Sequence, residues 1–387
     1  MVDEAAGDFS ETETMLAKAE ELCGPYVWGI YDILVLPPSF PFGGMENPCL
    51  TFATPTLLSG DKSNADVIAH EIAHSWTGNL VTNVNFEHFW LNEGFTVFTE
   101  RKIVGRMHGE PARHFSAMLG WKDLVETVET VMGPTNPFTA LSPKLAGKDP
   151  DDAFSVVPYE KGSTFLWYLE ELVGGAAVFE PFLKSYYTHF AYKSIDTEQF
   201  KDFFLQQFGS LEAATAIDWD TWLHAPGMPP YKPKFNDSLA VACWDLAKAW
   251  QAWDCTAQPQ PTFQQDFSKF SAKQKIEFFL TLTNGPAMPH AKLKAMASLY
   301  QLDLCSNVEV EFNWIRLGLA ARWEAAVAPA LRLATVQGRM KFVRPLYRDL
   351  YAWEEKRQEA VDTFVAHRDQ YMQTVADKVA KDLNISP

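Results

Sequence analysis

The stretch His70-Glu71-Ile72-Ala73-His74 says most about the fold and the chemistry of this chain. An α-helix repeats every ~3.6 residues, so His70 and His74 project from the same helix face, about one turn apart. Two imidazoles at that spacing can bind one divalent ion such as zinc. Glu71, between them in sequence, can act as a general base toward a water molecule. The stretch therefore predicts a metal-binding helix.

A third metal ligand is predicted in Trp90-Leu91-Asn92-Glu93-Gly94. Two histidines leave zinc short of a complete set of protein ligands. Glu93 lies at a separation from His74 that a second helix, folded back beside the first, would supply. Two histidines, one glutamate and one open position are typical of a catalytic zinc site rather than a structural one. His70, His74 and Glu93 therefore predict one zinc ion per chain and a zinc hydrolase.

The sequence around both segments is apolar at helical spacing, over residues 67–76 and 89–98. Histidines and glutamates inside such helices are costly to bury unless something neutralises or coordinates them. The alternative, that they are ordinary polar residues of a protein core, requires each of them to find a hydrogen-bonding partner. We favour the metal site because both segments show the same conflict.

Composition limits the possible partners of this chain. Its 387 residues, 47% of them hydrophobic, suffice for two domains. A net charge of −16 argues against nucleic acid or an anionic membrane as a partner. The five cysteines are scattered and form no C-x-x-C pair, and the sequence shows neither a signal peptide nor an apolar run of ~18 residues. We expect a cytoplasmic, monomeric protein.

The sequence divides into two parts at a proline-rich stretch. Residues 1–223 combine helical patterns with strand candidates at 31–36 and 50–54, residues 224–237 read as a linker, and residues 238–387 lack strand signals. The last part reads as helices with short breaks, which predicts a solenoid-like (HEAT/ARM-like) domain or a generic helical bundle. The predicted helices are Ser238–Ala252, Ser271–Thr283, Pro289–Tyr300, Val308–Leu319, Trp323–Thr335, Lys341–Ala352 and Arg357–Leu383.

Three segments, Pro37–Leu50, His70–Asn79 and Phe89–Gly94, resemble the M1 (gluzincin) family of zinc aminopeptidases. Within that family, the proline-rich run Pro37–Pro41 and the segment Gly338–Phe342 resemble the leukotriene A4 hydrolase subfamily. The resemblance implies an α+β, thermolysin-like metallopeptidase catalytic domain followed by an all-α C-terminal domain. Members of the subfamily begin with a β-rich domain that has no counterpart here, so we expect an N-terminally truncated catalytic domain.

The resemblance also implies the activity. The leading hypothesis is a zinc-dependent aminopeptidase acting on short peptides. An alternative is hydrolysis of a fatty-acid epoxide, alone or as a second activity of the same site. A third, from another class, is an inactive fragment whose helical domain serves interactions with other proteins.

Catalytic and substrate-binding roles follow from the matched motifs. Glu71 would be the general base, and Tyr159 would donate a hydrogen bond to the oxyanion that forms at the substrate carbonyl. Glu46 would bind the α-ammonium group of the substrate. The backbone beside it would contact the substrate chain closely, since its glycines leave room; this stretch comprises Gly43, Gly44, Met45 and Asn47.

Three further residues match substrate-binding positions of the subfamily. Arg339 and Lys341 correspond to a pair that recognises a carboxylate, for which guanidinium and ammonium groups are suited. Asp151 corresponds to an acid used in epoxide hydrolysis and in selecting basic N-terminal residues. Phe154 replaces a tyrosine of the animal enzymes, which makes epoxide chemistry less certain. Glu100 reads equally well as a support for a zinc histidine or as a solvated charge.

Overall fold

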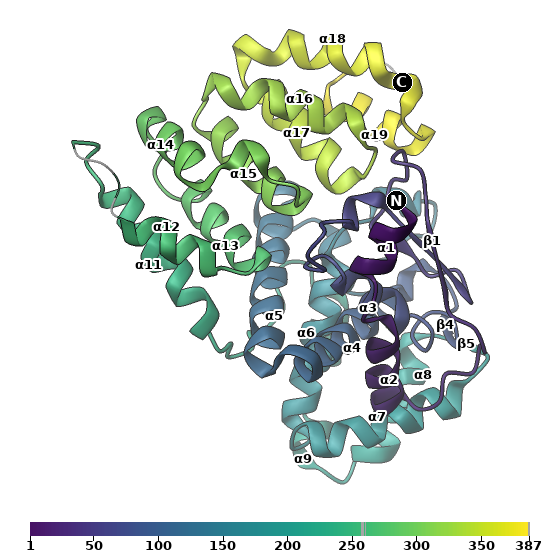
Figure 1. Ribbon diagram of the computed structural model, residues 1–387. Helices are drawn as coiled ribbons and strands as arrows, with labels where there is room; N and C mark the ends of the chain where they lie inside the picture. The colour runs from purple at the N-terminus through teal and green to yellow at the C-terminus, as the bar shows by residue number, and fades with distance from the viewer. Residues whose placement is uncertain (257–258, 260, 386–387) are drawn as a thin grey trace.

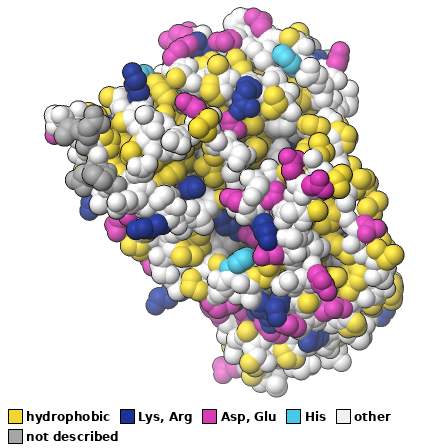
Figure 2. Space-filling view, in the orientation of Figure 1, with side chains coloured by type: hydrophobic (Ala, Val, Ile, Leu, Met, Phe, Trp, Pro, Cys, Tyr) yellow, Lys and Arg dark blue, Asp and Glu magenta, His cyan; other side chains and the backbone are white. Residues whose placement is uncertain are grey.

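The structure, a computed structural model, describes residues 1–256, 259 and 261–385. Its N-terminal part combines helices with two small sheets, and its C-terminal part is built from helices that arch over one side and the top of the N-terminal part in the view of Figure 1. Acidic and basic side chains are interspersed with hydrophobic ones over the face in Figure 2, so this face presents no extended basic patch.

The larger hydrophobic cores follow the two parts, and a small cluster of Phe115, Met118 and Ala240 joins them. The main core of the N-terminal part is formed by residues between Phe9 and Leu223. The helical part has two cores of its own, one between Cys243 and Leu317 and one between Phe312 and Leu383. Residues 225–237 connect the two parts without forming a helix or a strand.

The first sheet has three strands in the order β1-β3-β2. Strands β1 (Asp32–Val35) and β3 (Leu50–Ala53) are parallel and coincide with the two predicted strands to within two residues at each end. The short strand β2 (Gly44–Met45) runs antiparallel to β3, with Gly44 opposite Ala53. This pairing brings the Gly43-Gly44 segment to the edge of the sheet that faces the predicted metal helix. A second, parallel pair joins β4 (Val81–Asn83) to β5 (Lys193–Ile195).

Helix α4 (Trp90–His108) lies at the centre of the N-terminal part and packs against α3 (Asp66–Ala73) and α6 (Val157–Leu172). The crossing of α4 and α6 is close because a Cβ atom on Gly94 would lie only 2.8 Å from Cα of Gly162. The backbones therefore touch beside Glu93. The remaining helices of this part are α1 (Val2–Asp8), α2 (Thr12–Cys23), α5 (Glu110–Val125), α7 (Ala176–Phe190), α8 (Thr197–Phe208), α9 (Glu212–Thr215) and α10 (Trp219–His224).

The helices of the C-terminal part form two layers. One layer contains α11, α13, α15, α17 and α19, each packed on the next, and the other contains the contacting pairs α12 with α14 and α16 with α18. Such stacking of neighbouring units is the arrangement of a helical solenoid, so the solenoid-like alternative is the one the structure adopts. The helices are α11 (Ser238–Ala252), α12 (Pro261–Lys269), α13 (Ala272–Thr283), α14 (His290–Tyr300), α15 (Val308–Ala320), α16 (Val327–Val336), α17 (Met340–Ala352), α18 (Arg357–His367) and α19 (Gln373–Asp382).

One helix prediction for this part was wrong, and one helix was not predicted. The single helix predicted over 357–383 is divided into α18 and α19, because Tyr371 adopts an extended conformation and points into the core, where its hydroxyl donates to the carbonyl of Ala334 at 2.7 Å. Helix α12 was not predicted, although Phe263 and Phe267 recur at helical spacing and both are buried; the segment is short and rich in polar residues. Over the described residues, we find no helix with the length and apolar character needed to cross a bilayer.

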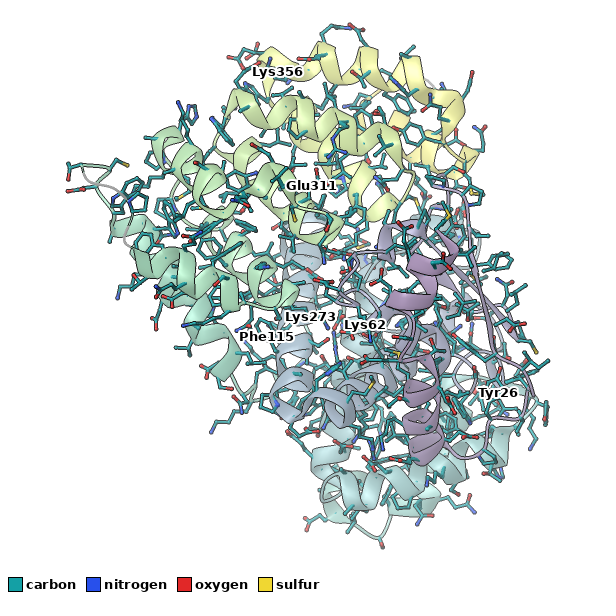
Figure 3. All side chains as sticks on the ribbon, viewed as in Figure 1. Tyr26, Lys62, Phe115, Lys273, Glu311 and Lys356 are labelled. Atoms are coloured by element: carbon teal, nitrogen blue, oxygen red, sulfur yellow. The ribbon has the colours of Figure 1, made fainter. Side chains whose placement is uncertain are left out.

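Contacts between the two parts include the predicted metal helix and the proline-rich run. Lys273 of α13, labelled in Figure 3, forms an ion pair with Asp66, the first residue of α3. The backbone N–H of Gly338 donates to Pro38 O at 2.8 Å, and that of Met340 donates to Pro41 O at 2.9 Å. The C-terminal part is therefore tied directly to segments that surround the candidate site.

Lys161 fixes α6 to two loops. Its side chain is fully buried, and Nζ donates to the carbonyls of Thr139 and Ala225 at 3.0 Å and of Gly227 at 2.9 Å. Burial lowers the pKa of Lys161 to about 8. The three carbonyls satisfy all three ammonium donors, so the lysine holds the loops beside the start of the helix that carries Tyr159.

We expect Lys161→Met to lower the free energy of unfolding by about 2–4 kcal/mol, because three buried carbonyls lose their donor. Denaturant unfolding followed by circular dichroism measures the change. The control is Lys193→Met, which removes an exposed lysine that donates to one carbonyl, that of His189. Equal losses of stability in the two variants would contradict the role given to Lys161.

Candidate metal centre

The structure brings the three predicted metal ligands together at the junction of α3 and α4. His70 lies in the last turn of α3, His74 directly follows that helix, and Glu93 lies in the first turn of α4. The Nε2 atoms of the histidines are 3.2 Å apart, and Oε2 of Glu93 lies 3.4 Å from His70 Nε2 and 3.5 Å from His74 Nε2. These three atoms can all be ligands of one ion.

The donor set fits zinc. Oε2 of Glu93 is buried and has no hydrogen-bonding partner among the described residues. A buried carboxylate oxygen facing two imidazole nitrogens is costly unless a cation compensates it. Two histidine nitrogens and one carboxylate oxygen are a typical protein ligand set for zinc in enzymes, in which a further position stays open for water or substrate.

Supporting hydrogen bonds direct both histidines toward the site. Nδ1 of His70 lies 3.0 Å from Oε2 of Glu100, and Nδ1 of His74 lies 2.9 Å from the carbonyl of Thr77 and 3.0 Å from Oγ1 of Thr96. With Nδ1 engaged in this way, Nε2 of each ring is the atom left for a metal. Of the two interpretations of Glu100, the support for a zinc histidine is therefore the one the structure favours.

Glu71 lies beside the ligand cluster in a tight backbone environment. A Cβ atom on Gly44 would lie 2.1 Å from Oε1 of Glu71, so a larger residue at this position would have to displace the Glu71 side chain. Oε2 of Glu71 is buried and makes no hydrogen bond within the described part of the chain. Burial, together with repulsion by the nearby carboxylates of Glu46 and Glu93, raises the pKa of Glu71 well above its usual value. A carboxylate with a raised pKa is suited to accepting a proton.

Glu46 is the second carboxylate beside the cluster. Its Oε1 lies 3.7 Å from Nδ1 of His74 and accepts a long hydrogen bond, 3.4 Å, from Nδ2 of Asn92. Its backbone carbonyl accepts from Nδ2 of Asn79 at 2.8 Å, which fixes the segment. Of the neighbouring predicted residues, Met45 is exposed, whereas Nδ2 of Asn47 is buried without a partner in the described chain.

Tyr159 stands over the cluster from the first turn of α6. Its ring stacks on that of His70, with centroids 6.2 Å apart and planes at 15°. Phe89 and Phe154 pack edge-on against it at 6.2 and 6.3 Å. Burial and the carboxylate of Glu93 raise the pKa of Tyr159 well above its usual value, so the phenol stays protonated and can donate a hydrogen bond.

Asp151 lies outside this group. It occupies a short 3₁₀ turn (Pro150–Asp152) with an exposed side chain, and its backbone carbonyl accepts from Nζ of Lys378 at 3.0 Å. Phe154, three residues further, is about half exposed and its ring lies 6.4 Å from that of Phe42. Among the described residues, Asp151 makes no hydrogen bond or ion pair with the three metal ligands, and its carbonyl is bonded to the C-terminal part instead.

Arg339 and Lys341 reach the site from the C-terminal part. A Cβ atom on Gly43 would lie 2.8 Å from Nη2 of Arg339, so the guanidinium lies against the glycine that precedes Gly44. Arg339 is buried, and its Nη1 donates to Oγ1 of Thr56 at 3.3 Å. Lys341 lies on α17, whose first turn follows Arg339. Gly43 thus lies against Arg339, the predicted carboxylate-binding residue, and Gly44 lies against Glu71, the predicted base.

Two residues of this region were missed from the sequence. Asn92, which contacts Glu46, stands directly before Glu93 in the quoted motif and could have been found there. Glu309 on α15 accepts hydrogen bonds from both Arg339 and Lys341. No local sequence signal distinguishes Glu309 from the other acidic residues of its helix.

Two family models match the chain. A model described as the peptidase family M1 domain matches residues 9–222, and one described as leukotriene A4 hydrolase, C-terminal, matches residues 270–383. The first match covers more than half of the chain. It includes every predicted metal ligand and Tyr159.

Named relatives and a solved structure agree with the two family models. Leukotriene A-4 hydrolase of Xenopus laevis is 51% identical over 389 residues, covering 100% of this chain and 63% of that protein. Leucine aminopeptidase 2 of Neosartorya fischeri is 46% identical over 381 residues, covering 97% of this chain and 60% of that protein. A structure of yeast LTA4 hydrolase in complex with Bestatin has a TM-score of 0.93 and 41% identity, covering 99% of this chain and 64% of that one.

The chain thus spans roughly three-fifths of the length of these relatives. The likenesses confirm the fold class that the motifs predicted, a peptidase domain followed by a helical C-terminal domain. Since a family model matches the segment that holds the metal centre, the chain belongs to peptidase family M1, a family of zinc metallopeptidases.

Proposed function

We propose that this protein is a zinc-dependent aminopeptidase that removes N-terminal residues from short peptides, with one zinc ion per chain held by His70, His74 and Glu93. The observation that carries the proposal is the position of Glu46. Its carboxylate lies beside the ligand cluster, 3.7 Å from His74, without being one of the three ligands. A fixed carboxylate at that place can bind the α-ammonium group of a peptide, so that only the first peptide bond reaches the metal.

The side chains divide the chemistry between them. Zinc bound by the three ligands supplies a Lewis acid and lowers the pKa of a water molecule. Glu71 accepts the proton of the attacking water at its buried, unpartnered Oε2 and passes it to the leaving amine. The phenol of Tyr159 donates a hydrogen bond to the oxyanion that develops at the substrate carbonyl.

Residues of the C-terminal part would bind the C-terminal end of the peptide. In this proposal Arg339 and Lys341 bind the C-terminal carboxylate of the peptide, and Gly43, Gly44, Met45 and Asn47 contact its backbone. The close approach of Arg339 to Gly43 supports this assignment, because it places the guanidinium beside the segment proposed to contact the peptide backbone. Short peptides are then favoured over long ones. Asp151 would select basic N-terminal residues, the role of the acid it matches in the subfamily.

The proposed roles correspond to two domains joined by a linker. We assign residues 1–223 to the catalytic domain, 224–237 to the linker and 238–387 to the helical domain. The separate main cores of the two parts support this division.

We further propose that the chain acts as a monomer in the cytoplasm. All five cysteines are unpaired, which is typical of a reducing compartment and supports that location.

We expect Glu46→Gln to lower kcat/KM for an alanyl amide by about 10–100-fold, because the substrate ammonium loses a charge-assisted hydrogen bond. Rates are measured with the zinc-loaded chain and compared with those of Glu13→Gln, which removes an exposed glutamate of α2. The unaltered protein should not cleave the N-acetylated substrate. Efficient cleavage of that substrate would exclude the aminopeptidase and leave an endopeptidase.

Hydrolysis of a fatty-acid epoxide is a second candidate. The name of the Xenopus relative supports it, as do the rings of Phe42 and Phe154, which form an exposed apolar wall beside Tyr159. Incubating the zinc-loaded chain with leukotriene A4 and separating the products by chromatography tests it. Formation of an enzyme-dependent dihydroxy acid would establish the activity, and the products of spontaneous hydrolysis alone would exclude it.

A further inference from the structure

A buried carboxylate stands between the two cations assigned to substrate binding. The side chain of Glu309 is 11% exposed. It accepts from Nζ of Lys341 at 2.8 and 2.9 Å, one bond to each oxygen, and from Nη1 of Arg339 at 3.2 Å. Burial opposes the charge of Glu309, but Lys341 and Arg339 outweigh it and lower the pKa of this carboxyl. Glu309 is therefore an ionised counterion of the pair.

The counterion leaves part of the pair available. Among the described residues, every hydrogen bond of the Arg339 guanidinium comes from Nη1, whereas Nη2 lies against Gly43. The side chain of Lys341 is 53% exposed although its ammonium contacts Glu309. Counted within Arg339, Lys341 and Glu309 alone, two positive charges and one negative charge leave one net positive charge, and Nη2 of Arg339 lies against Gly43 of the proposed substrate-binding segment.

The backbone around Arg339 is held without Glu309. It is bonded to the proline-rich run through the N–H groups of Gly338 and Met340. A Cβ atom on Gly338 would lie 2.7 Å from the carbonyl oxygen of Ser39, so the two segments are in direct contact. Glu309 therefore acts on the side chain of Arg339, as a hydrogen-bond acceptor and as a counterion.

We propose that Glu309 determines how strongly this site binds a substrate carboxylate, by cancelling one of the two positive charges of Arg339 and Lys341. This inference rests on the proposed function, since it takes the pair to face the C-terminus of a peptide. One remaining charge matches one carboxylate. One net charge still binds the carboxylate of a short peptide. Two uncancelled charges would bind that peptide and its shortened product more tightly.

The prediction is an increase in affinity on removing the charge. Glu309→Gln keeps an oxygen that can accept from Lys341 or Arg339 but relieves the repulsion between Glu309 and the incoming carboxylate. We expect trialanine to bind about three- to tenfold more tightly to the Glu309→Gln variant. The C-terminal amide of trialanine, which carries no carboxylate, should bind with an affinity changed less than about twofold.

Isothermal titration calorimetry on the zinc-loaded chain measures both affinities, in a Glu71→Gln background that prevents turnover. The matched control is Glu311→Gln. Glu311, labelled in Figure 3, lies on the same helix and forms an ion pair with Arg332 instead. This control should leave both affinities unchanged. Glu309→Asp, which keeps the charge, should leave the ratio of acid to amide affinity unchanged and serves if the glutamine variant does not fold.

The outcomes separate the two proposals. Tighter binding of the acid alone in Glu309→Gln supports the role of Glu309. Weaker binding of the acid, an equal change for acid and amide, or binding of neither probe would overturn it. The calorimetric comparison needs no turnover, so a failure of the unaltered chain to hydrolyse peptides counts against the proposed function and not against this inference.

Discussion

Glu71→Gln is expected to lower kcat for an alanyl amide by about 10³–10⁴-fold, because the site loses the group that accepts the proton of the attacking water. Glutamine has the same shape but cannot accept that proton. Since Glu71 is not one of the three residues proposed as zinc ligands, zinc content should stay that of the unaltered chain. KM should change little, because no hydrogen bond of Oε2 to other described residues is lost.

The variant is compared with Glu13→Gln, which tests whether removing any one carboxylate has the same effect. Metal analysis and circular dichroism are run on each sample. A Glu71→Gln chain that is folded, zinc-loaded and still active within tenfold of the unaltered protein would show that another group is the base. Loss of zinc together with activity would instead make Glu71 part of the metal binding.

Tyr159→Phe is expected to lower kcat by about 10²–10³-fold with a smaller effect on KM, because the hydroxyl acts on charge that develops only in the transition state. The ring contacts with His70, Phe89 and Phe154 are kept by phenylalanine. Structure and metal binding should therefore be unaffected. Steady-state kinetics with peptide amides measures the two constants.

The control for this variant is Tyr168→Phe. Tyr168 lies on the same helix, α6, but packs against Trp222 and Tyr231, away from the metal ligands. Its replacement should leave kcat within about twofold. If Tyr159→Phe raised KM and left kcat unchanged, Tyr159 would be a packing residue of the binding site and the oxyanion donor would have to be sought elsewhere.

The features that could be predicted from the sequence are those fixed locally. The spacing of His70 and His74 places them on one helix face in any helical context, and the apolar period of α11 gave its bounds, Ser238–Ala252, as the structure has them. The break between α18 and α19 depends on Tyr371, whose partner Ala334 is distant in the chain. Its cause is tertiary, so helical periodicity does not reveal it.

The candidate site divides in the same way. Its metal ligands could be derived from spacing and ligand chemistry, whereas Glu46, Tyr159 and Arg339 required resemblance to a family. Arg339 directly precedes helix α17, and a charged side chain at a helix start is usually exposed to solvent. The side chain of Arg339 is instead buried against Gly43. Glu309 could not be predicted, because its importance comes from two cations that approach it only when α15 and α17 pack together.

The measurement that tests the proposed function most directly is the zinc content of the purified chain, determined together with its hydrolysis of alanyl and arginyl amides before and after chelation. We expect one zinc ion per chain, loss of hydrolysis when the chelator removes it, and recovery when zinc is added back. Hydrolysis that persists in the zinc-free protein, or a folded chain that binds no zinc, would contradict a catalytic zinc site at His70, His74 and Glu93.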